Sequence, residues 1–394
     1  MKDNFTGRNP DSKFNKNNVI LIAGFLVVLF GLTIASMINP VKAFSENENR
    51  ILAARPEFSI DSLLSGKFTS DYEEFITDQF VFRDNWIGIK TISERAMLKQ
   101  DINGVFFGKD GYLIEKHNDT DIDREQLKKN IDRLSEFVKK YSEELGDDRV
   151  KVMMIPTASD ILVDKLPPFA PGYDQEAFIE QLKTSLNDPK SFVDVRDSLM
   201  EKNKEYIFYK TDHHWTSLGA YYAYEAWANA IGVEPWKQED FNIEKVTSQF
   251  YGTIFSKVNT RVKPDDINLY LTKDNVNYEL TYNLEEDKKK DTLYDMEQLE
   301  GKDKYSVFLG GNNAVVKIST TNQNDRKLLV IKDSFAHSFV PFAVNHYEET
   351  HMIDFRYFNM NISQYIEEND ITDVLVLYNV INFAKDKNSG KLVK

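Results

Sequence analysis

A run of twenty residues without a charged side chain, Val19 to Ile38, lies near the N-terminus. At the rise of an α-helix this run spans about 30 Å, the thickness of the hydrocarbon core of a bilayer. Basic residues outnumber acidic ones before it: Lys2, Arg8, Lys13 and Lys16 against Asp3 and Asp11. A basic flank stays on the cytoplasmic side. The run therefore predicts one membrane-spanning helix, with the rest of the chain outside the cell membrane.

This interpretation divides the chain into a cytoplasmic tail (1–18), an anchor (19–38), a connector (39–60) and an extracytoplasmic body (61–394) with a β-rich insertion at about 250–320. A cleaved signal peptide is the alternative, because Val41-Lys42-Ala43 offers small residues at the spacing that signal peptidase accepts. The apolar run is longer than the usual apolar region of such a peptide, which favours an uncleaved anchor.

Charge and cysteine content exclude several classes of function. The net charge of −14 disfavours nucleic acid as a partner, because binding to phosphates requires basic patches. The chain has no cysteine, so it forms neither disulfides nor thiolate metal sites. We expect no metal and no cofactor.

The body alternates between helical and strand patterns. Helical spacing of apolar residues covers 124–145 and 217–232, and short apolar runs typical of buried strands cover 150–155 and 328–332. A helix pattern at 335–345 follows the last of these strands. Alternation at this spacing predicts an α/β fold with a mainly parallel sheet.

Ser334 lies where the strand 328–332 meets the following helix. Side chains at that place stand above the carboxyl ends of the strands, where α/β sheets bind ligands. The unpaired N–H groups of a helix start can hold the negative oxygen of a tetrahedral intermediate. Ser334 is a candidate nucleophile on these grounds, and a helix cap formed by Asp333-Ser334 is the alternative.

Asp212 and His214 supply the other two groups of a serine acyl-transfer site. A serine hydroxyl requires a base, and the base requires a carboxylate that fixes its tautomer. An Asp two residues before a His on a turn can reach one ring nitrogen of that His. A metal site at Asp212, His213 and His214 is the weaker interpretation, because neighbouring side chains diverge and no second ligand cluster is present.

Two further residues near these motifs have alternative interpretations. His337 lies three residues after Ser334 on the same expected helix face, which makes it a rival base. Trp215 follows the histidines and is either a core anchor or a platform for a sugar.

The run TDHHWT, with ENR at 48–50, GKDGYLIE at 108–115 and the later DSF, resembles the DHHW family of bacterial extracytoplasmic proteins. That family is similar to the alginate O-acetyltransferases, which have a fold like that of SGNH hydrolases. The resemblance implies a three-layer sandwich in which Asp212 orients the base His214 and Ser334 is the nucleophile. It further implies that a membrane-bound O-acyltransferase donates the acetyl group and that an exported polysaccharide accepts it.

The motifs depart from the SGNH pattern in three respects. In ordinary SGNH hydrolases the serine precedes the Asp and the His along the chain, whereas here the order is reversed, as in the alginate enzymes. Lys332 stands where a Gly usually precedes Asp-Ser, which brings a charged side chain near the site. The oxyanion or substrate-binding residues have no clear motif, and Asn312, Asn379 and Asn382 are the candidates. Two alternatives stay open at this point: a carbohydrate esterase with the same triad, and a non-catalytic, membrane-tethered glycan-binding accessory protein.

Overall fold

A computed structural model describes residues 16–45, 50–273, 276–285 and 287–393. The expected tail therefore lies mostly outside the described residues, and its residues 16–18 are helical. The chain separates into two compact units, one formed by residues up to 45 together with 49–87, and one formed mainly by 88–394. That division comes later than residue 61, where we expected the body to begin. The domain boundaries stay a prediction.

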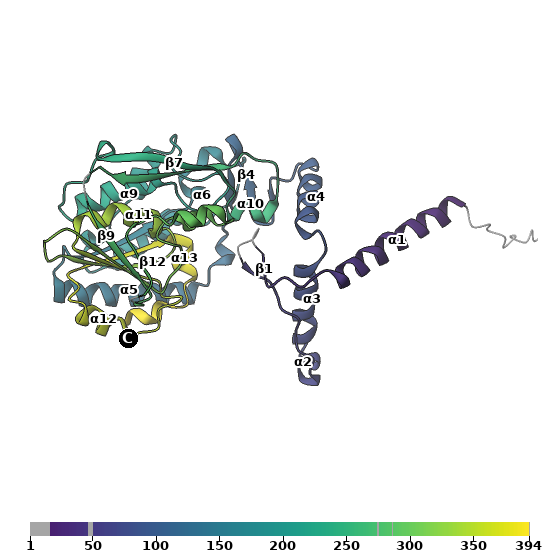
Figure 1. Ribbon diagram of the computed structural model, residues 1–394, viewed down its shortest axis with the longest axis horizontal. Coiled ribbons are helices and arrows are strands. Elements are labelled where there is room, and N and C mark those ends of the chain that lie inside the picture. The colour runs from purple at the N-terminus through teal and green to yellow at the C-terminus, as the bar shows by residue number, and fades with distance from the viewer. Residues whose placement is uncertain (1–15, 46–49, 274–275, 286, 394) are drawn as a thin grey trace, which may run out of the picture. The chain divides into compact units, whose positions relative to one another are not determined.

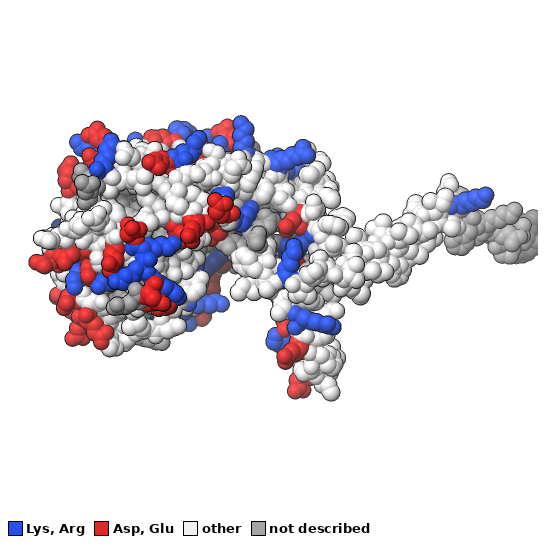
Figure 2. All heavy atoms as spheres, in the orientation of Figure 1, with Lys and Arg blue, Asp and Glu red and all other residues white. Residues whose placement is uncertain are grey.

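The first unit contains the apolar helix α1 (Lys16–Ile38), of which no residue is buried. Its mean hydropathy of 2.7 and its length make it the one helix in the described part of the chain that could cross a membrane. Figure 2 shows the apolar run of α1 without charged atoms, whereas both signs of charge mix over the second unit on the face in view. The smaller elements of this unit are β1 (Phe44–Ser45), β2 (Arg50–Ile51), α2 (Ile60–Leu64), α3 (Lys67–Gln79) and the start of α4 (Arg83–Ala96).

The second unit is built on a seven-stranded sheet of order β10-β9-β11-β13-β12-β14-β6 (Figure 1). The strands are β6 (Val150–Ile155), β9 (Tyr278–Tyr282), β10 (Lys289–Lys290), β11 (Val315–Thr320), β12 (Lys327–Lys332), β13 (Glu349–Ile353) and β14 (Asp373–Asn379). Strands β13, β12, β14 and β6 are parallel, and β11, β9 and β10 continue the sheet antiparallel.

The sheet is thus mixed, and the expectation of a mainly parallel sheet is only partly met. The antiparallel part comes from the segment that we expected to be a β-rich insertion. Its strands β9 and β11 pair with each other, and β11 pairs with β13, so they extend the central sheet. Strands β7 (Phe241–Phe250) and β8 (Asp265–Thr272) form an antiparallel ribbon apart from the central sheet. A hairpin around Lys109 is formed by β4 (Val105–Phe107) and β5 (Leu113–Glu115), with β3 (Asp101–Ile102) beside β4.

Helices cover both faces of the sheet (Figure 1). Successive side chains of a strand point to opposite faces, and both faces of this sheet carry buried apolar side chains. On β12, Leu328 and Val330 belong to the apolar cluster on one face of the sheet, whereas Leu329 and Ile331 belong to the apolar cluster on the other face. The helices of this unit are α5 (Arg124–Leu145), α6 (Ala158–Ile161), α7 (Gln175–Ser185), α8 (Arg196–Glu201), α9 (Ser217–Ala230), α10 (Thr253–Val258), α11 (Ala336–Ala343), α12 (Ile362–Glu368) and α13 (Val380–Lys385). The α/β architecture agrees with the sequence.

Gly219 holds helix α9 close to the strand-like segment before the histidine turn. A Cβ at this position would lie 2.3 Å from the backbone oxygen of Ile207 and 3.1 Å from the Cβ of Trp215. We expect Gly219→Ala to lower the free energy of unfolding by about 1–3 kcal/mol, because backbone must move to admit the methyl group. Urea unfolding followed by circular dichroism measures this change. Gly172→Ala is the matched control, since nothing lies within 4 Å of its Cβ, and equal stability of the two variants would contradict the prediction.

Candidate active site

The turn that carries the histidines is fixed by a buried carboxylate from the ribbon. Asp265 on β8 accepts hydrogen bonds from the backbone N–H groups of Lys210 and Thr211, both at 2.8 Å, and from the hydroxyls of Thr211 and Tyr206. Burial raises the pKa of Asp265, and these four donors oppose that change by satisfying the charged form. Thr216 ends the turn and caps α9 by accepting a hydrogen bond from the N–H of Gly219 at 3.3 Å.

A second buried carboxylate shapes the loop that carries Ser334, between β12 and α11. Asp333 accepts hydrogen bonds from the N–H of Phe335 at 2.9 Å, from the N–H of Asn379 at 2.8 Å and from Nδ2 of Asn382 at 2.8 Å. Helix α11 begins after Phe335 without a side-chain cap. Ser334 is therefore not a cap, and its hydroxyl is directed to another partner.

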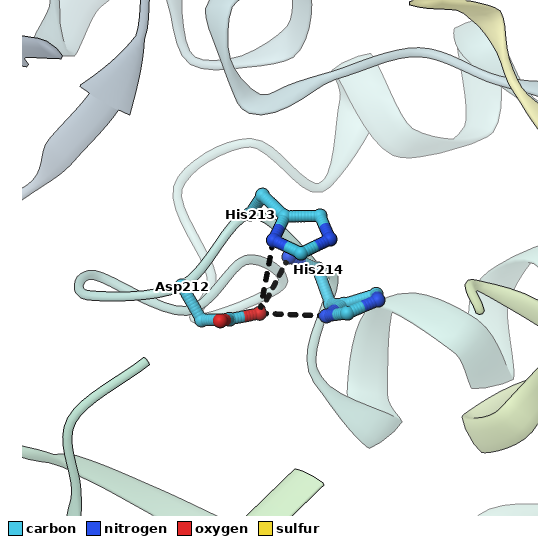
Figure 3. Close-up of side chains that lie close together, drawn as sticks. All are labelled: Asp212, His213 and His214. Atoms are coloured by element: carbon cyan, nitrogen blue, oxygen red, sulfur yellow. Dashed lines mark hydrogen bonds and ion pairs between the residues drawn. The ribbon is translucent and has the colours of Figure 1, made fainter. Parts of the chain in front are cut away.

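Asp212, His214 and Ser334 meet in space although 120 positions separate the histidine from the serine. Nε2 of His214 lies 2.7 Å from Oγ of Ser334, and Nδ1 lies 2.6 Å from Oδ1 of Asp212. Figure 3 shows this carboxylate oxygen between the two histidines and the backbone of His214. The other oxygen, Oδ2, accepts from the N–H of Thr253 at 2.8 Å and from its hydroxyl at 3.0 Å. The structure thus brings the three candidate residues together, and their catalytic roles stay a prediction.

Burial and charge set the protonation states of this group. Burial alone would raise the pKa of Asp212, but the two histidines and the donors of Thr253 hold it well below its usual value. Burial, with His213 beside it, lowers the pKa of His214 to about 4, although Asp212 opposes the shift. At neutral pH the carboxylate is charged and the imidazole neutral, so Nε2 can accept a proton from the serine.

Tyr305 is a contact that sequence reasoning missed. Its ring stacks on that of His214 with a centroid separation of 3.9 Å and an angle of 9°. Its hydroxyl bonds the backbone oxygen of Ser334 at 3.1 Å, so the same side chain supports the base and the serine loop. Tyr305 lies in a single turn of 3₁₀ helix, Lys304–Val307, where no spacing or motif signals its role.

Lys332 and His337 face away from the serine. Nζ of Lys332 donates to Nε2 of His337 at 2.7 Å and to Asp354 at 3.2 Å, and all three side chains are buried. Lys332 is the last residue of β12, and its side chain is held by His337 of α11 and by Asp354, which follows β13. The rival base is thus occupied elsewhere, and His214 holds the position next to the serine.

Of the remaining candidate residues, most make structural contacts, and Asn382 has an amide hydrogen that is accessible. Trp215 is fully buried and donates from Nε1 to the backbone oxygen of Phe335 at 3.0 Å, so it is a core anchor rather than a sugar platform. Asn379 caps α13, and its Nδ2 is bonded to the backbone oxygen of Ile155. Asn312 is exposed and accepts from Arg356. Asn382 keeps one amide hydrogen beyond the one it gives to Asp333.

A pocket of about 280 Å³ adjoins the triad. Its lining includes His213, Phe335 and Asn382, together with Glu115, Lys257 and Lys385. The pocket thus borders the serine loop and brings charged, amide and imidazole groups to one place, as a substrate site requires.

The potential metal ligands Asp212, His213 and His214 have atoms within 4.8 Å of one another. Those atoms are already engaged in hydrogen bonds, because Nδ1 of His214 faces Asp212 and Nδ1 of His213 lies 2.7 Å from the hydroxyl of Thr253. This donor arrangement fits a serine triad better than a metal centre, which would need these nitrogens unprotonated.

Residues 137–353, more than half of the chain, match the family model described as DHHW protein. The crystal structure of a DHHW family protein from Eubacterium siraeum DSM 15702 is similar at 26% identity and a TM-score of 0.61, over 74% of this chain and 96% of that chain. None of the curated proteins matches the chain.

Two more distant structures are also similar. Bacillus cereus PatB1, solved with a sulfonyl adduct, has 21% identity and a TM-score of 0.59, over 73% of this chain and 97% of that chain. The O-acetyltransferase domain of Pseudomonas putida AlgJ has 14% identity and a TM-score of 0.43, over 72% and 93%. The resemblance expected from the sequence is confirmed. PatB1 bears on the fold alone, and AlgJ is too distant to carry an argument about chemistry.

Gly252 is a close neighbour of the triad carboxylate. A Cβ at this position would lie 2.2 Å from the Cβ and 2.3 Å from Oδ2 of Asp212. We expect Gly252→Ala to displace the carboxylate and so to lower the reactivity of Ser334 by about 10-fold or more, because small misplacement of reacting groups is costly. The rate of modification of Ser334 by a sulfonyl fluoride, followed by mass spectrometry, measures it. Unchanged reactivity would show that Asp212 does not orient His214.

Proposed function

The chain belongs to the DHHW family, and we propose that it is an extracytoplasmic O-acetyltransferase that acts through an acetyl-serine on Ser334. In this proposal α1 anchors the protein in the cell membrane, a membrane-bound O-acyltransferase supplies the acetyl group, and a hydroxyl of an exported or cell-surface polysaccharide accepts it. The polypeptide body after the anchor lies outside the membrane.

The observation that carries the proposal is the pair of contacts from His214 to Ser334 at 2.7 Å and to Asp212 at 2.6 Å. In the first half-reaction Nε2 of His214 takes the proton of the serine hydroxyl while Oγ attacks the carbonyl carbon of the donor ester. The tetrahedral intermediate expels the donor alcohol, which leaves with the proton from His214. The product is acetyl-Ser334.

In the second half-reaction His214 removes the proton of the acceptor hydroxyl, whose oxygen attacks the acetyl carbon. Collapse of that intermediate forms the new ester, and the proton on His214 returns to Oγ of Ser334. The ring stack with Tyr305 and the bond to Asp212 keep the imidazole in one orientation through both steps. Hydrolysis would follow the same path with water as the acceptor.

Asn382 is our proposed donor to the oxyanion. Its side chain lines the pocket beside the serine loop, and Asp333 holds one of its amide hydrogens. The second hydrogen remains for the substrate, and a fixed amide directed at developing charge stabilises a transition state.

Full-length protein in detergent, mixed with p-nitrophenyl acetate, should release a burst of p-nitrophenol and gain one acetyl group on the peptide that contains Ser334. Ser334→Ala and His214→Ala should each lower the burst rate by at least about 10³-fold, because triad members act as a unit. Asp212→Asn should be as damaging or somewhat milder. The free energy of unfolding of Ser334→Ala should change by less than about 1 kcal/mol, since the hydroxyl makes one hydrogen bond.

Ser70→Ala, at an exposed serine of α3, is the matched control for these substitutions. It should leave the burst unchanged. Acetylation of a serine other than Ser334, or a burst that persists in Ser334→Ala, would contradict the assignment of the nucleophile.

The burst rate should depend on pH through His214, whose pKa is lowered to about 4 by burial. The base must be neutral to accept a proton, so the rate should be full above about pH 5.5 and fall about tenfold per unit below pH 4. Stopped-flow measurements between pH 3 and pH 8 test this. A midpoint near 6.5, the usual pKa of histidine, would contradict a buried and neutral base.

A further inference from the structure

The mechanism proposed above gives no role to His213, the neighbour of the base. Its ring lies against that of His214, with centroids 3.9 Å apart and an angle of 36° between the planes. Its side chain is 29% exposed, whereas that of His214 is 7% exposed. The difference arises because His213 lines the pocket beside the serine loop.

Hydrogen bonding fixes the tautomer of His213. The hydroxyl of Thr253 has a single hydrogen, which it donates to Oδ2 of Asp212 at 3.0 Å. The contact of 2.7 Å between this hydroxyl and Nδ1 of His213 then requires the proton to be on Nδ1. In this tautomer Nε2 of His213 carries no hydrogen and is an acceptor, and no hydrogen-bond partner for it is present among the residues that the structure describes.

The two histidines are therefore oriented alike. Each carries its proton on Nδ1 toward Asp212, directly in His214 and through Thr253 in His213. Figure 3 shows the second ring nitrogen of each imidazole on the side away from the carboxylate. Nε2 of His214 lies 2.7 Å from Oγ of Ser334, and the ring that carries the second acceptor, Nε2 of His213, has its centroid 3.9 Å from the His214 ring.

We propose that this pair of imidazoles selects an acceptor with two adjacent free hydroxyls, a vicinal diol of a sugar ring. The inference rests on the proposed function. His214 removes the proton of the hydroxyl that attacks acetyl-Ser334, and Nε2 of His213 accepts a hydrogen bond from the neighbouring hydroxyl. Adjacent hydroxyls of a sugar are separated by roughly one hydrogen-bond length, so a diol can contact both nitrogens at once.

The proton balance of the transfer step is unchanged by this contact. One hydroxyl oxygen forms the new bond to the acetyl carbon, its proton passes to His214 and then to Oγ of Ser334, and the bond from Oγ to the acetyl carbon breaks. The second hydroxyl keeps its proton and donates it to His213. Water offers no second hydroxyl at a fixed distance, so the contact favours transfer over hydrolysis.

Ethylene glycol and 2-methoxyethanol test the inference, because they differ only in a methyl group that removes the second donor. Full-length enzyme in detergent is acetylated with p-nitrophenyl acetate in the presence of either alcohol, and the ratio of transferred to hydrolysed acetyl is measured. Counted per reacting hydroxyl, the glycol should be preferred by about fivefold, the effect of one hydrogen bond.

Two conservative variants separate binding from structure. In His213→Asn the amide can still donate to Thr253 but places no atom at the position of Nε2. The preference for ethylene glycol over 2-methoxyethanol should therefore fall to about one. Gln in His213→Gln reaches that position with an amide oxygen and should keep part of the preference. The preference is measured as the ratio of transferred to hydrolysed acetyl from the same acetyl-Ser334, so a change in the rate of the burst in either variant does not enter it.

The outcomes distinguish the two levels of the proposal. Wild-type protein that never forms acetyl-Ser334 would overturn the proposed function. Acetylation without a preference for the glycol, or a preference that His213→Asn retains, would overturn the diol inference alone. A burst that a chelator removes and zinc restores would overturn the assigned tautomer and the inference with it.

Discussion

The arrangement of the site depends on one desolvated carboxylate. Asp212 is buried, and its two oxygens accept hydrogen bonds from the backbone and ring of His214 and from the backbone and hydroxyl of Thr253. A buried charge is costly unless its oxygens are satisfied in this way. The requirement joins the histidine turn to α10, and the absence of a side chain at Gly252 gives the carboxylate its space.

Two further buried carboxylates repeat this principle at the neighbouring loops. Asp265 holds the backbone of the histidine turn, and Asp333 holds the serine loop to the end of β14. Each replaces regular secondary structure with side-chain to backbone hydrogen bonds, so that two irregular segments become rigid. Rigid loops at the carboxyl ends of parallel strands are what a preorganised catalytic site requires.

The separation of roles between the adjacent histidines also follows from hydrogen bonding. His214 is buried beneath Tyr305 and faces Ser334, and His213 borders the pocket. Both share Asp212, so their ring nitrogens point the same way. In the mechanism that we propose, a doubled histidine at this turn offers one group for proton transfer and one for recognition of the acceptor.

The sequence by itself determined the α/β alternation, the helix at 124–145 and the strand at 150–155, because local periodicity is a property of the chain. Through motif spacing it also singled out Asp212, His214 and Ser334 as candidates. It could not assign β9 and β11 to the central sheet, since pairing between distant strands has no local signal. Nor could it exclude Lys332 and Trp215 from the pocket or find Tyr305, Thr253 and Gly252. Those contacts exist only once the turn, the 3₁₀ segment and α10 pack together, because burial and hydrogen-bond direction are properties of the folded chain.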